Sequence, residues 1–161
     1  MIGPRVENDL IRGWRITRTK YAEKSVAFSG RGAAENPGRW NKAGVPIVYT
    51  CSSIALCALE TLVHTRSQKA LNGRFALFEV EIPVNLISTT ELPSDLRARQ
   101  QTQEIGDRWI KEAHYAVLRV PSVVTGEPNY LLNPNHPDFS KIKIGEAMVF
   151  HFDRRLVRQE S

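Results

Sequence analysis

The sequence predicts an α+β fold in which short strands and two or three helices share one core. Apolar stretches with the length of strands lie at residues 45–50, 75–82 and 116–120. Longer stretches with helical spacing of their apolar residues lie between them, at about 53–64 and 95–113. No internal repeat, low-complexity tract or shift in composition divides the chain, so these elements are expected to pack together.

Length and composition are those of an ordinary globular protein. The chain has 161 residues, of which 42% are hydrophobic and 24% charged, and we expect a single domain over residues 1–161. Its first ten residues lack an apolar core of signal-peptide length. No window approaches the roughly 20 apolar residues of a membrane helix. The sequence therefore predicts a cytoplasmic protein that does not contact a membrane.

The net charge of +5 is only weak evidence for an anionic partner. The basic residues are dispersed, and they show neither a long run nor the interleaved aromatic residues of single-stranded nucleic-acid sites. Solvated faces explain most of this charge. A phosphate-bearing small molecule, an acidic protein and RNA would each suit the remainder.

The first strand is predicted around Trp14, Arg15 and Ile16. Alternation along a strand places Trp14 and Ile16 on one face and Arg15 on the other. An arginine here is usually a surface residue, but beside a cleft it would bind phosphate, because its planar fork matches phosphate oxygens. The glycine-rich loop at 28–38 has neither a GxGxxG pattern nor a Walker lysine, which excludes the Rossmann and P-loop types of nucleotide loop.

The centre of the chain is a strand followed by an apolar helix. The strand at 45–50 carries Tyr49, and either Ser52 or Ser53 can cap the helix that follows. This helix is expected to end near His64, where a cation suits the helix dipole. A catalytic role for His64 is the less favoured alternative.

One acid, Glu60, lies in the otherwise apolar stretch 54–63. At helical spacing it shares a stripe with Leu56, Cys57 and Val63, which are residues of types that are usually buried. An ionised carboxylate among such neighbours is costly unless something compensates it. Two interpretations stay open: a structural ion pair with an arginine, or a carboxylate held in a cleft to meet a cationic transition state.

The second half of the chain begins with a strand at 75–82 that Pro83 ends. Ser94 can cap a helical region over about 95–113, and the glycine at position 106 suggests a break within it. We therefore expect two helical pieces here.

A further short strand is predicted at 116–120, closed by Pro121 and Ser122. The segment 126–137 is dense in asparagine and proline, which predicts a long ordered loop. The last strand is expected at 148–152.

The cysteines and histidines show no metal-ligand pattern. Cys51 and Cys57 are six residues apart, which matches neither CxxC metal spacing nor a disulfide framework. We expect them to be small core residues, and we expect no metal site.

Short motifs follow one another over nearly the whole chain. They are, in order, Trp14-Arg15, Ala27-Phe28-Ser29-Gly30, Gly38-Arg39-Trp40-Asn41, Val45 to Tyr49, Ala58-Leu59-Glu60-Thr61-Leu62-Val63-His64, Val120-Pro121-Ser122, Asn129-Tyr130-Leu131-Leu132-Asn133-Pro134 and Phe152-Asp153-Arg154-Arg155-Leu156. Together, in this order and spacing, they resemble the RES-domain toxins, the toxin half of bacterial Xre–RES toxin–antitoxin pairs. Arg31 is a departure, since many relatives carry an acidic residue in this loop.

The resemblance implies a fold similar to ADP-ribosyltransferase toxins and a reaction that consumes NAD as substrate, with no prosthetic group. The family cleaves the nicotinamide–ribose bond. Characterised members resemble phosphorylases, which use inorganic phosphate to give nicotinamide and ADP-ribose-1″-phosphate, and at least one relative has been regarded as an ADP-ribosyltransferase that acts on a protein. A DNA-binding Xre antitoxin neutralises the toxin by blocking the active site. The resemblance thus implies an antitoxin partner in a higher-order complex, and no direct DNA binding by this chain.

The resemblance also implies roles for individual residues. Glu60 would stabilise the oxocarbenium character that develops at the ribose C1″, or position the ribose hydroxyls. Arg15 and Arg39 would hold the pyrophosphate or the incoming phosphate. Tyr49 would pack on the nicotinamide ribose, and Ser122 would contact nicotinamide or phosphate. The expected catalytic set is Glu60, Arg39, Tyr49 and Ser122, with Arg15, Asn41, Asn129 and Asn133 as substrate-binding residues.

Two alternatives from other functional classes stay open. An RNA-targeting toxin would suit the basic charge, but a ribonuclease usually needs a histidine as general acid or base. The four histidines share no local motif, and RNA binding would weaken steeply with salt. A non-catalytic interaction module would leave Glu60 unexplained except as a structural ion pair. Within the enzyme interpretation, phosphorolysis, hydrolysis and transfer to a protein are not distinguished.

Overall fold

The computed structural model describes residues 9–65, 67–88 and 92–156, and these ranges contain an eight-stranded sheet. Its strands are β1 (Leu10–Arg18), β2 (Val48–Cys51), β3 (Phe75–Pro83), β4 (Ile87–Ser88), β5 (Val117–Pro121), β6 (Pro128–Leu132), β7 (Lys143–Ile144) and β8 (Met148–Phe150). They run in the order β4-β5-β6-β2-β1-β3-β7, and β8 also pairs with β3. Only β4 and β5 are parallel among these pairs, so the sheet is mixed.

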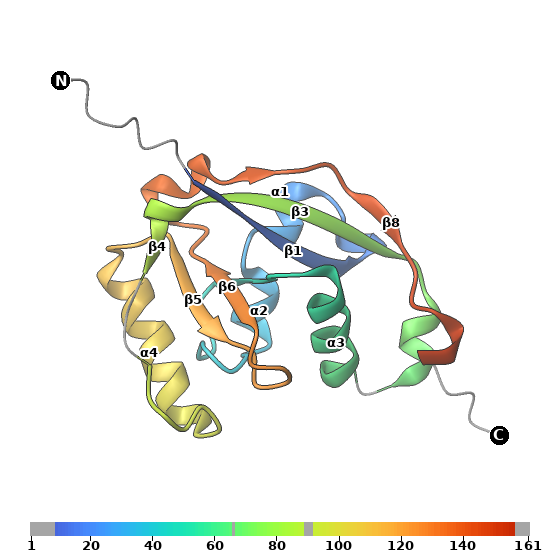
Figure 1. Ribbon diagram of the computed structural model, residues 1–161, viewed down its shortest axis with the longest axis horizontal. Coiled ribbons are helices and arrows are strands. Elements are labelled where there is room, and N and C mark those ends of the chain that lie inside the picture. The colour runs from blue at the N-terminus through green and yellow to red at the C-terminus, as the bar shows by residue number, and fades with distance from the viewer. Residues whose placement is uncertain (1–8, 66, 89–91, 157–161) are drawn as a thin grey trace.

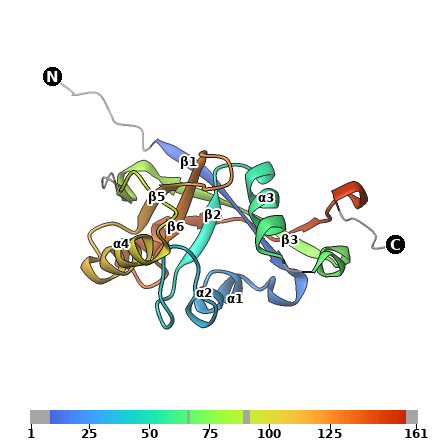
Figure 2. The same cartoon turned by 90° about the horizontal axis from the view of Figure 1, so that it is seen from below.

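The helices are few and two of them are short. They are α1 (Lys24–Ala27), α2 (Arg31–Glu35), α3 (Ile54–His64) and α4 (Arg99–Glu112), with 3-10 turns at η1 (Thr19–Tyr21), η2 (Gln68–Asn72), η3 (Val84–Leu86), η4 (Pro137–Lys141) and η5 (Arg154–Leu156). In Figures 1 and 2 the β5–β6 hairpin lies between α3 and α4, while α1 and α2 lie together beside β2. The predicted α+β class is confirmed: this is one compact domain with a curled sheet.

The longest strands follow the expected alternation. In β3 the residues Phe78, Val80 and Ile82 are fully buried, because they share the inward face of the strand. Glu79 on the outward face pairs with Arg12 of β1 at 3.0 Å. The predicted strand at 75–82 is thus confirmed, and β1 is longer than the three residues expected.

The predicted central helix is also confirmed. Ser53 is the N-cap of α3, and its hydroxyl accepts a hydrogen bond from the Leu56 amide at 3.0 Å. β2 begins at Val48, three residues later than predicted, because Val45 closes a turn through its amide to Lys42.

Two expectations for the second helix are wrong. α4 begins at Arg99 with Ala98 as its N-cap, so Ser94 does not cap it. The helix is continuous through Gly106. This glycine does not bend the helix; it lies against the main chain of Trp40. A Cβ added to Gly106 would lie 1.7 Å from the Trp40 carbonyl oxygen. The glycine therefore serves close packing between the helix and the loop.

The predicted long loop at 126–137 is also wrong, since it contains β6. Tyr130, Leu131 and Leu132 are buried in the middle of the sheet, where β6 pairs with both β2 and β5. The asparagines and prolines that suggested a loop lie at the two ends of this strand. At the end of the chain β8 stops at Phe150, and Phe152 packs edge-to-face on it.

The sheet separates two apolar layers. Val48 and Phe78 belong to the larger cluster, whereas Ile47 and Leu131 pack toward α4. Cys51 of β2 and Leu56 of α3 belong to a smaller cluster between that strand and that helix. Within the described residues, none of the helices is both long and apolar enough to cross a membrane.

Candidate active site

The Glu60 carboxylate is held by side chains from two other elements. Its Oε1 accepts a hydrogen bond from the Ser122 hydroxyl at 2.6 Å and another from the Asn129 side-chain amide at 3.0 Å. Its Oε2 lies 3.4 Å from Nε2 of His64, one helical turn further along α3. One oxygen is thus fixed by the sheet, and the other faces an exposed imidazole.

The sheet register explains why these groups meet. Val120 and Asn129 are paired across β5 and β6, and Asn129 is also paired with Cys51 of β2. Cys51 immediately precedes the turn into α3. The end of β5, the start of β6 and the first turns of α3 therefore converge on one point.

Ser122 is buried, and its hydroxyl does three things. It donates to Glu60, and it accepts from the amides of Val124 and Thr125 at 3.1 and 3.3 Å. These amides fix the direction of its proton toward the carboxylate. In this structure the Ser122 hydroxyl is bound directly to the Glu60 carboxylate.

The environment of Glu60 favours its charged form. The hydrogen bond from His64, with those from Ser122 and Asn129, lowers the pKa of Glu60 to about 2, against the opposing effect of burial. The carboxylate is therefore ionised at neutral pH while its side chain is only 19% exposed.

We expect this lowered pKa to appear as a pH-dependent stability. A carboxyl whose pKa is lower in the folded state stabilises the fold above its unfolded pKa, about 4.3, and loses that contribution as the pH falls toward 2. The wild-type protein should therefore lose more stability than Glu60→Gln between pH 5 and about 2. Thermal unfolding of both proteins across this range measures the difference, and parallel curves would contradict it.

A second group of predicted residues surrounds the loop before β2. Asn41 is fully buried, and its side-chain amide donates to the carbonyls of Ala33 and Val45 at 2.7 and 3.0 Å. Its Oδ1 accepts from the Gly38 amide at 2.9 Å and from the Tyr49 hydroxyl at 2.7 Å. The hydrogen bonds of the buried Asn41 side chain thus hold together the loop before β2.

Tyr49 completes this network. Its hydroxyl donates to Asn41 and accepts from the Trp40 amide at 3.2 Å, and burial raises its pKa. A Cβ added to Gly38 would lie 2.6 Å from this hydroxyl, so a glycine is needed there. Tyr49 therefore positions the segment that carries Arg39.

Arg39 is half-buried at the other side of the loop. Its Nη1 donates to the Leu96 carbonyl at 2.8 Å, just before α4. The remaining guanidinium nitrogens have no partner among the described residues. This forked cation is available to an anion.

Arg15 projects from the opposite face of β1 to Trp14, as predicted. Its Nε donates to the Ala27 carbonyl at 2.8 Å, and its Nη1 donates to the Tyr49 carbonyl at 3.0 Å. Burial lowers its pKa, and no carboxylate compensates its charge among the described residues. Arg15 thus connects β2 to α1 through two hydrogen bonds. It also places a buried positive charge next to the main chain of Tyr49.

The structure brings most of the predicted residues into two groups and leaves one outside. Glu60, Ser122 and Asn129 are in contact, and Arg39, Asn41 and Tyr49 share the second network, with Arg15 hydrogen-bonded beneath it. Asn133 lies elsewhere: it is buried in the turn after β6, and its Oδ1 accepts from the Asn135 amide at 3.0 Å.

Sequence reasoning missed the side of α4 that faces Arg39. Thr102 and Gln103 donate hydrogen bonds to the carbonyls of Arg39 and Gly38 at 2.6 and 3.0 Å. The signal that points to this face is Gly106, since a glycine inside a helix often marks a close approach of another backbone.

Both cysteines are buried, as predicted: Cys51 at the end of β2 and Cys57 on the inner side of α3. The hydrogen bond between their thiols lowers the pKa of Cys57 and raises that of Cys51. Both thiols lie within electrostatic range of Arg15 and Glu60. In the described part of the chain, no cluster of three or more histidines, cysteines and acids could hold a metal ion.

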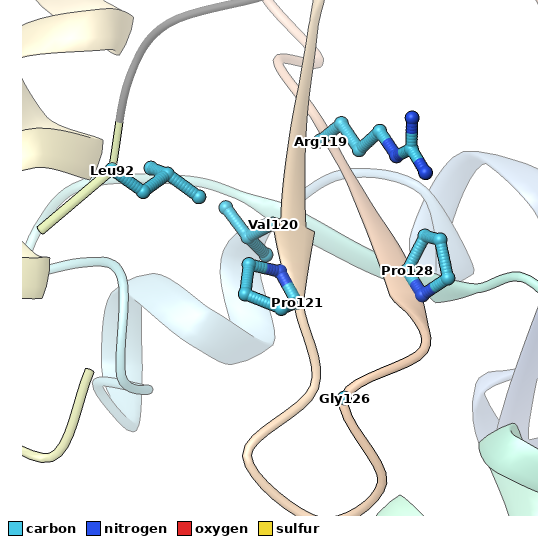
Figure 3. Close-up of a pocket in the computed structure, with 6 residues that line it drawn as sticks. All are labelled: Leu92, Arg119, Val120, Pro121, Gly126 and Pro128. Atoms are coloured by element: carbon cyan, nitrogen blue, oxygen red, sulfur yellow. The ribbon is translucent and has the colours of Figure 1, made fainter. Parts of the chain in front are cut away.

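A small cavity lies on the β5–β6 hairpin. It has a volume of about 210 Å³ and is lined by Leu92, Arg119, Val120, Pro121, Gly126 and Pro128. Figure 3 shows Leu92 and Arg119 on opposite sides of β5. The cavity is smaller than most small-molecule sites, which have about 300–1,000 Å³. Pro121 and Pro128, which line the cavity, restrict the backbone of the hairpin next to Ser122 and Asn129.

The fold and this site define a class of small α+β domains in which an ionised glutamate on a helix is fixed by a serine and an asparagine from the sheet. The profile of the RES domain family matches residues 12–153, and the chain belongs to this family.

Curated relatives match over nearly their whole length. The chain is 41% identical to a protein named Toxin Res from Photorhabdus laumondii, over 90% of this chain and 96% of the relative. It is 36% identical to a protein named Prs ADP-ribosylating toxin from Sphingobium sp., over 91% of this chain and 96% of the relative.

A solved structure shares the fold. The crystal structure of the M. tuberculosis MbcT–MbcA toxin–antitoxin complex contains a chain that matches with a TM-score of 0.70 and 18% sequence identity. The match covers 89% of this chain and 86% of the other. At this identity the likeness concerns the fold alone.

Proposed function

We propose that this protein is the toxin of a toxin–antitoxin pair and that it depletes NAD by breaking the nicotinamide–ribose bond. The observation that carries the proposal is the Glu60 carboxylate, which is ionised and largely shielded from water. Ser122 and Asn129 hold its Oε1, while its Oε2 faces the exposed His64. An acid used only as a structural ion pair would have an arginine or lysine partner. Among the residues that the structure describes, the partners of Glu60 are Ser122, Asn129 and the exposed His64.

The chemistry follows from the charge that develops in this reaction. As the C1″–N bond breaks, nicotinamide leaves with the bonding electron pair and the ribose gains oxocarbenium character. A fixed carboxylate stabilises that cation, which exists only near the transition state. An oxygen of inorganic phosphate then bonds to C1″, giving ADP-ribose-1″-phosphate and neutral nicotinamide.

Arg39 supplies the opposite charge. Its unpaired guanidinium nitrogens suit the pyrophosphate of NAD or the incoming phosphate, because a planar fork can bind two oxygens at once. Arg15 adds a second cation beneath the same region. In this proposal Ser122 and Asn129 position Glu60, and Tyr49 positions the Arg39 loop.

The test is incubation of the purified protein with NAD, with and without inorganic phosphate, followed by product masses. We expect NAD loss that requires phosphate and yields ADP-ribose carrying one phosphate. Loss without phosphate, giving ADP-ribose, would instead identify a glycohydrolase. Intact NAD under both conditions, with a normal thermal transition, would count against NAD cleavage into solution.

A second candidate is transfer of ADP-ribose to a protein. It is favoured by the relative from Sphingobium sp., whose name describes ADP-ribosylation of Prs. Labelled NAD and a bacterial lysate distinguish this activity, because label attached to a protein band appears only if a side chain accepts the ADP-ribose.

We also propose a cognate antitoxin as partner, of the Xre type, in a higher-order complex in which it covers the Glu60 site. The solved fold relative is itself half of a toxin–antitoxin complex. Co-expression with the antitoxin should suppress both NAD loss and growth arrest, and salt-resistant co-purification would support direct binding.

A further inference from the structure

One face of α4 is docked along the main chain that carries Arg39. Arg99 donates to the Pro37 carbonyl at 2.5 Å, Gln103 to the Gly38 carbonyl at 3.0 Å, and Thr102 to the Arg39 carbonyl at 2.6 Å. Three consecutive carbonyls are thus held by one helix.

The next turn of α4 continues the same docking. Gly106 lies against the Trp40 carbonyl, and Asp107 accepts from the Lys42 amide at 3.1 Å. The Arg39 guanidinium itself is bonded to the Leu96 carbonyl, just ahead of the helix. Both ends of the Arg39 residue, its carbonyl and its guanidinium, are therefore set by the segment 96–107.

Thr102 is the residue of this face that contacts Arg39 most directly. It is fully buried, and its hydroxyl is the only described donor to the Arg39 carbonyl. Losing this donor would leave a partly buried carbonyl without its partner among the described residues, which costs more than losing a fully exposed hydrogen bond. Valine has the same shape and no hydroxyl.

We infer that Thr102 is a positioning residue for Arg39, and that α4 sets where the guanidinium meets the phosphate groups of the substrate. This inference rests on the proposed function, in which Arg39 binds those groups. Thr102 itself touches neither substrate nor the reacting atoms, since a main-chain hydrogen bond transmits its effect.

The experiment compares Thr102→Val with Thr102→Ser, which keeps the hydroxyl, and with Glu104→Gln on the exposed side of α4. We expect Thr102→Val to raise the KM for NAD or phosphate by about fivefold to tenfold while kcat changes little. Thr102→Ser should restore the wild-type KM, and Glu104→Gln should match wild type throughout. A Thr102→Val protein that is less stable but kinetically unchanged would overturn the inference.

Amide hydrogen exchange of residues 38–42 in the free proteins provides an independent measurement. In Thr102→Val these amides should exchange faster than in wild type, Thr102→Ser or Glu104→Gln, because the loop has lost an attachment to α4. Equal exchange rates would overturn the inference without any activity assay. Absence of NAD loss in the wild type would instead remove the proposed function, so the two failures are distinguishable.

Discussion

Replacing Glu60 with glutamine should leave the protein folded and reduce NAD consumption by about 10²- to 10³-fold. Glutamine keeps an oxygen that can accept the hydrogen bonds of Ser122 and Asn129, which explains why the fold should persist. It lacks the negative charge that, in the proposed reaction, meets the oxocarbenium ion, and removing one such preorganised group typically costs this factor in kcat. Initial rates of NAD loss measure the effect, and growth after induction should recover in parallel.

The matched control for this substitution is Glu146→Gln. Glu146 is exposed and pairs with Lys24 far from the site, so its loss should change neither rate nor growth. Loss of the thermal transition in Glu60→Gln would favour the structural interpretation of this acid. A folded Glu60→Gln protein with wild-type activity would contradict its catalytic role.

Replacing Gly106 with alanine should destabilise the fold by about 3 kcal/mol or more, although alanine favours helices over glycine by about 1 kcal/mol. The added Cβ would lie 1.7 Å from the carbonyl oxygen and 2.7 Å from the carbonyl carbon of Trp40. These are backbone atoms that cannot rotate away, so either α4 or the Arg39 loop must shift. Denaturant unfolding measures the loss of stability, and NAD consumption should fall with it.

Gly32→Ala is the matched control on another helix. Gly32 lies in α2, and a Cβ there would meet no atom within 4 Å. That variant should be neutral or up to about 1 kcal/mol more stable than wild type. Similar stability in the two alanine variants would contradict the close approach of α4 to Trp40.

Local patterns along the chain predicted the elements whose periodicity is strong. The alternation in β3 and the helix α3 with Ser53 as its cap both appear where expected. Only Leu56 and Cys57 of α3 are buried, however, and Val63, which was expected to share their stripe, is exposed. The pattern does not reveal β6, because the strand begins with Pro128 and Asn129 and is followed directly by Asn133 and Pro134. Its strand conformation depends on β2 and β5, which pair with it on both sides, and no local pattern reveals those partners.

The site was predictable as a set of residues but not as a geometry. Glu60 is conspicuous because a carboxylate in an apolar stripe requires compensation, and the motif resemblance adds Ser122 and Asn129. The sequence does not show that these two bind the same oxygen of Glu60, because that depends on the β5–β6 register. Local sequence favours a helix break at Gly106, because the contact that explains this glycine, the Trp40 carbonyl, is 66 positions earlier in the chain.

The Glu60 cluster joins residues from distant parts of the chain, and this has a consequence during synthesis. A ribosome releases Arg39, Tyr49 and Glu60 early, but Ser122 and Asn129 follow only after most of the polypeptide has been made. Until β6 inserts between β2 and β5, the carboxylate lacks the two groups that orient it. The Glu60 cluster can therefore form only after residue 129 has left the ribosome, so the carboxylate acquires its fixed orientation in a late step of folding.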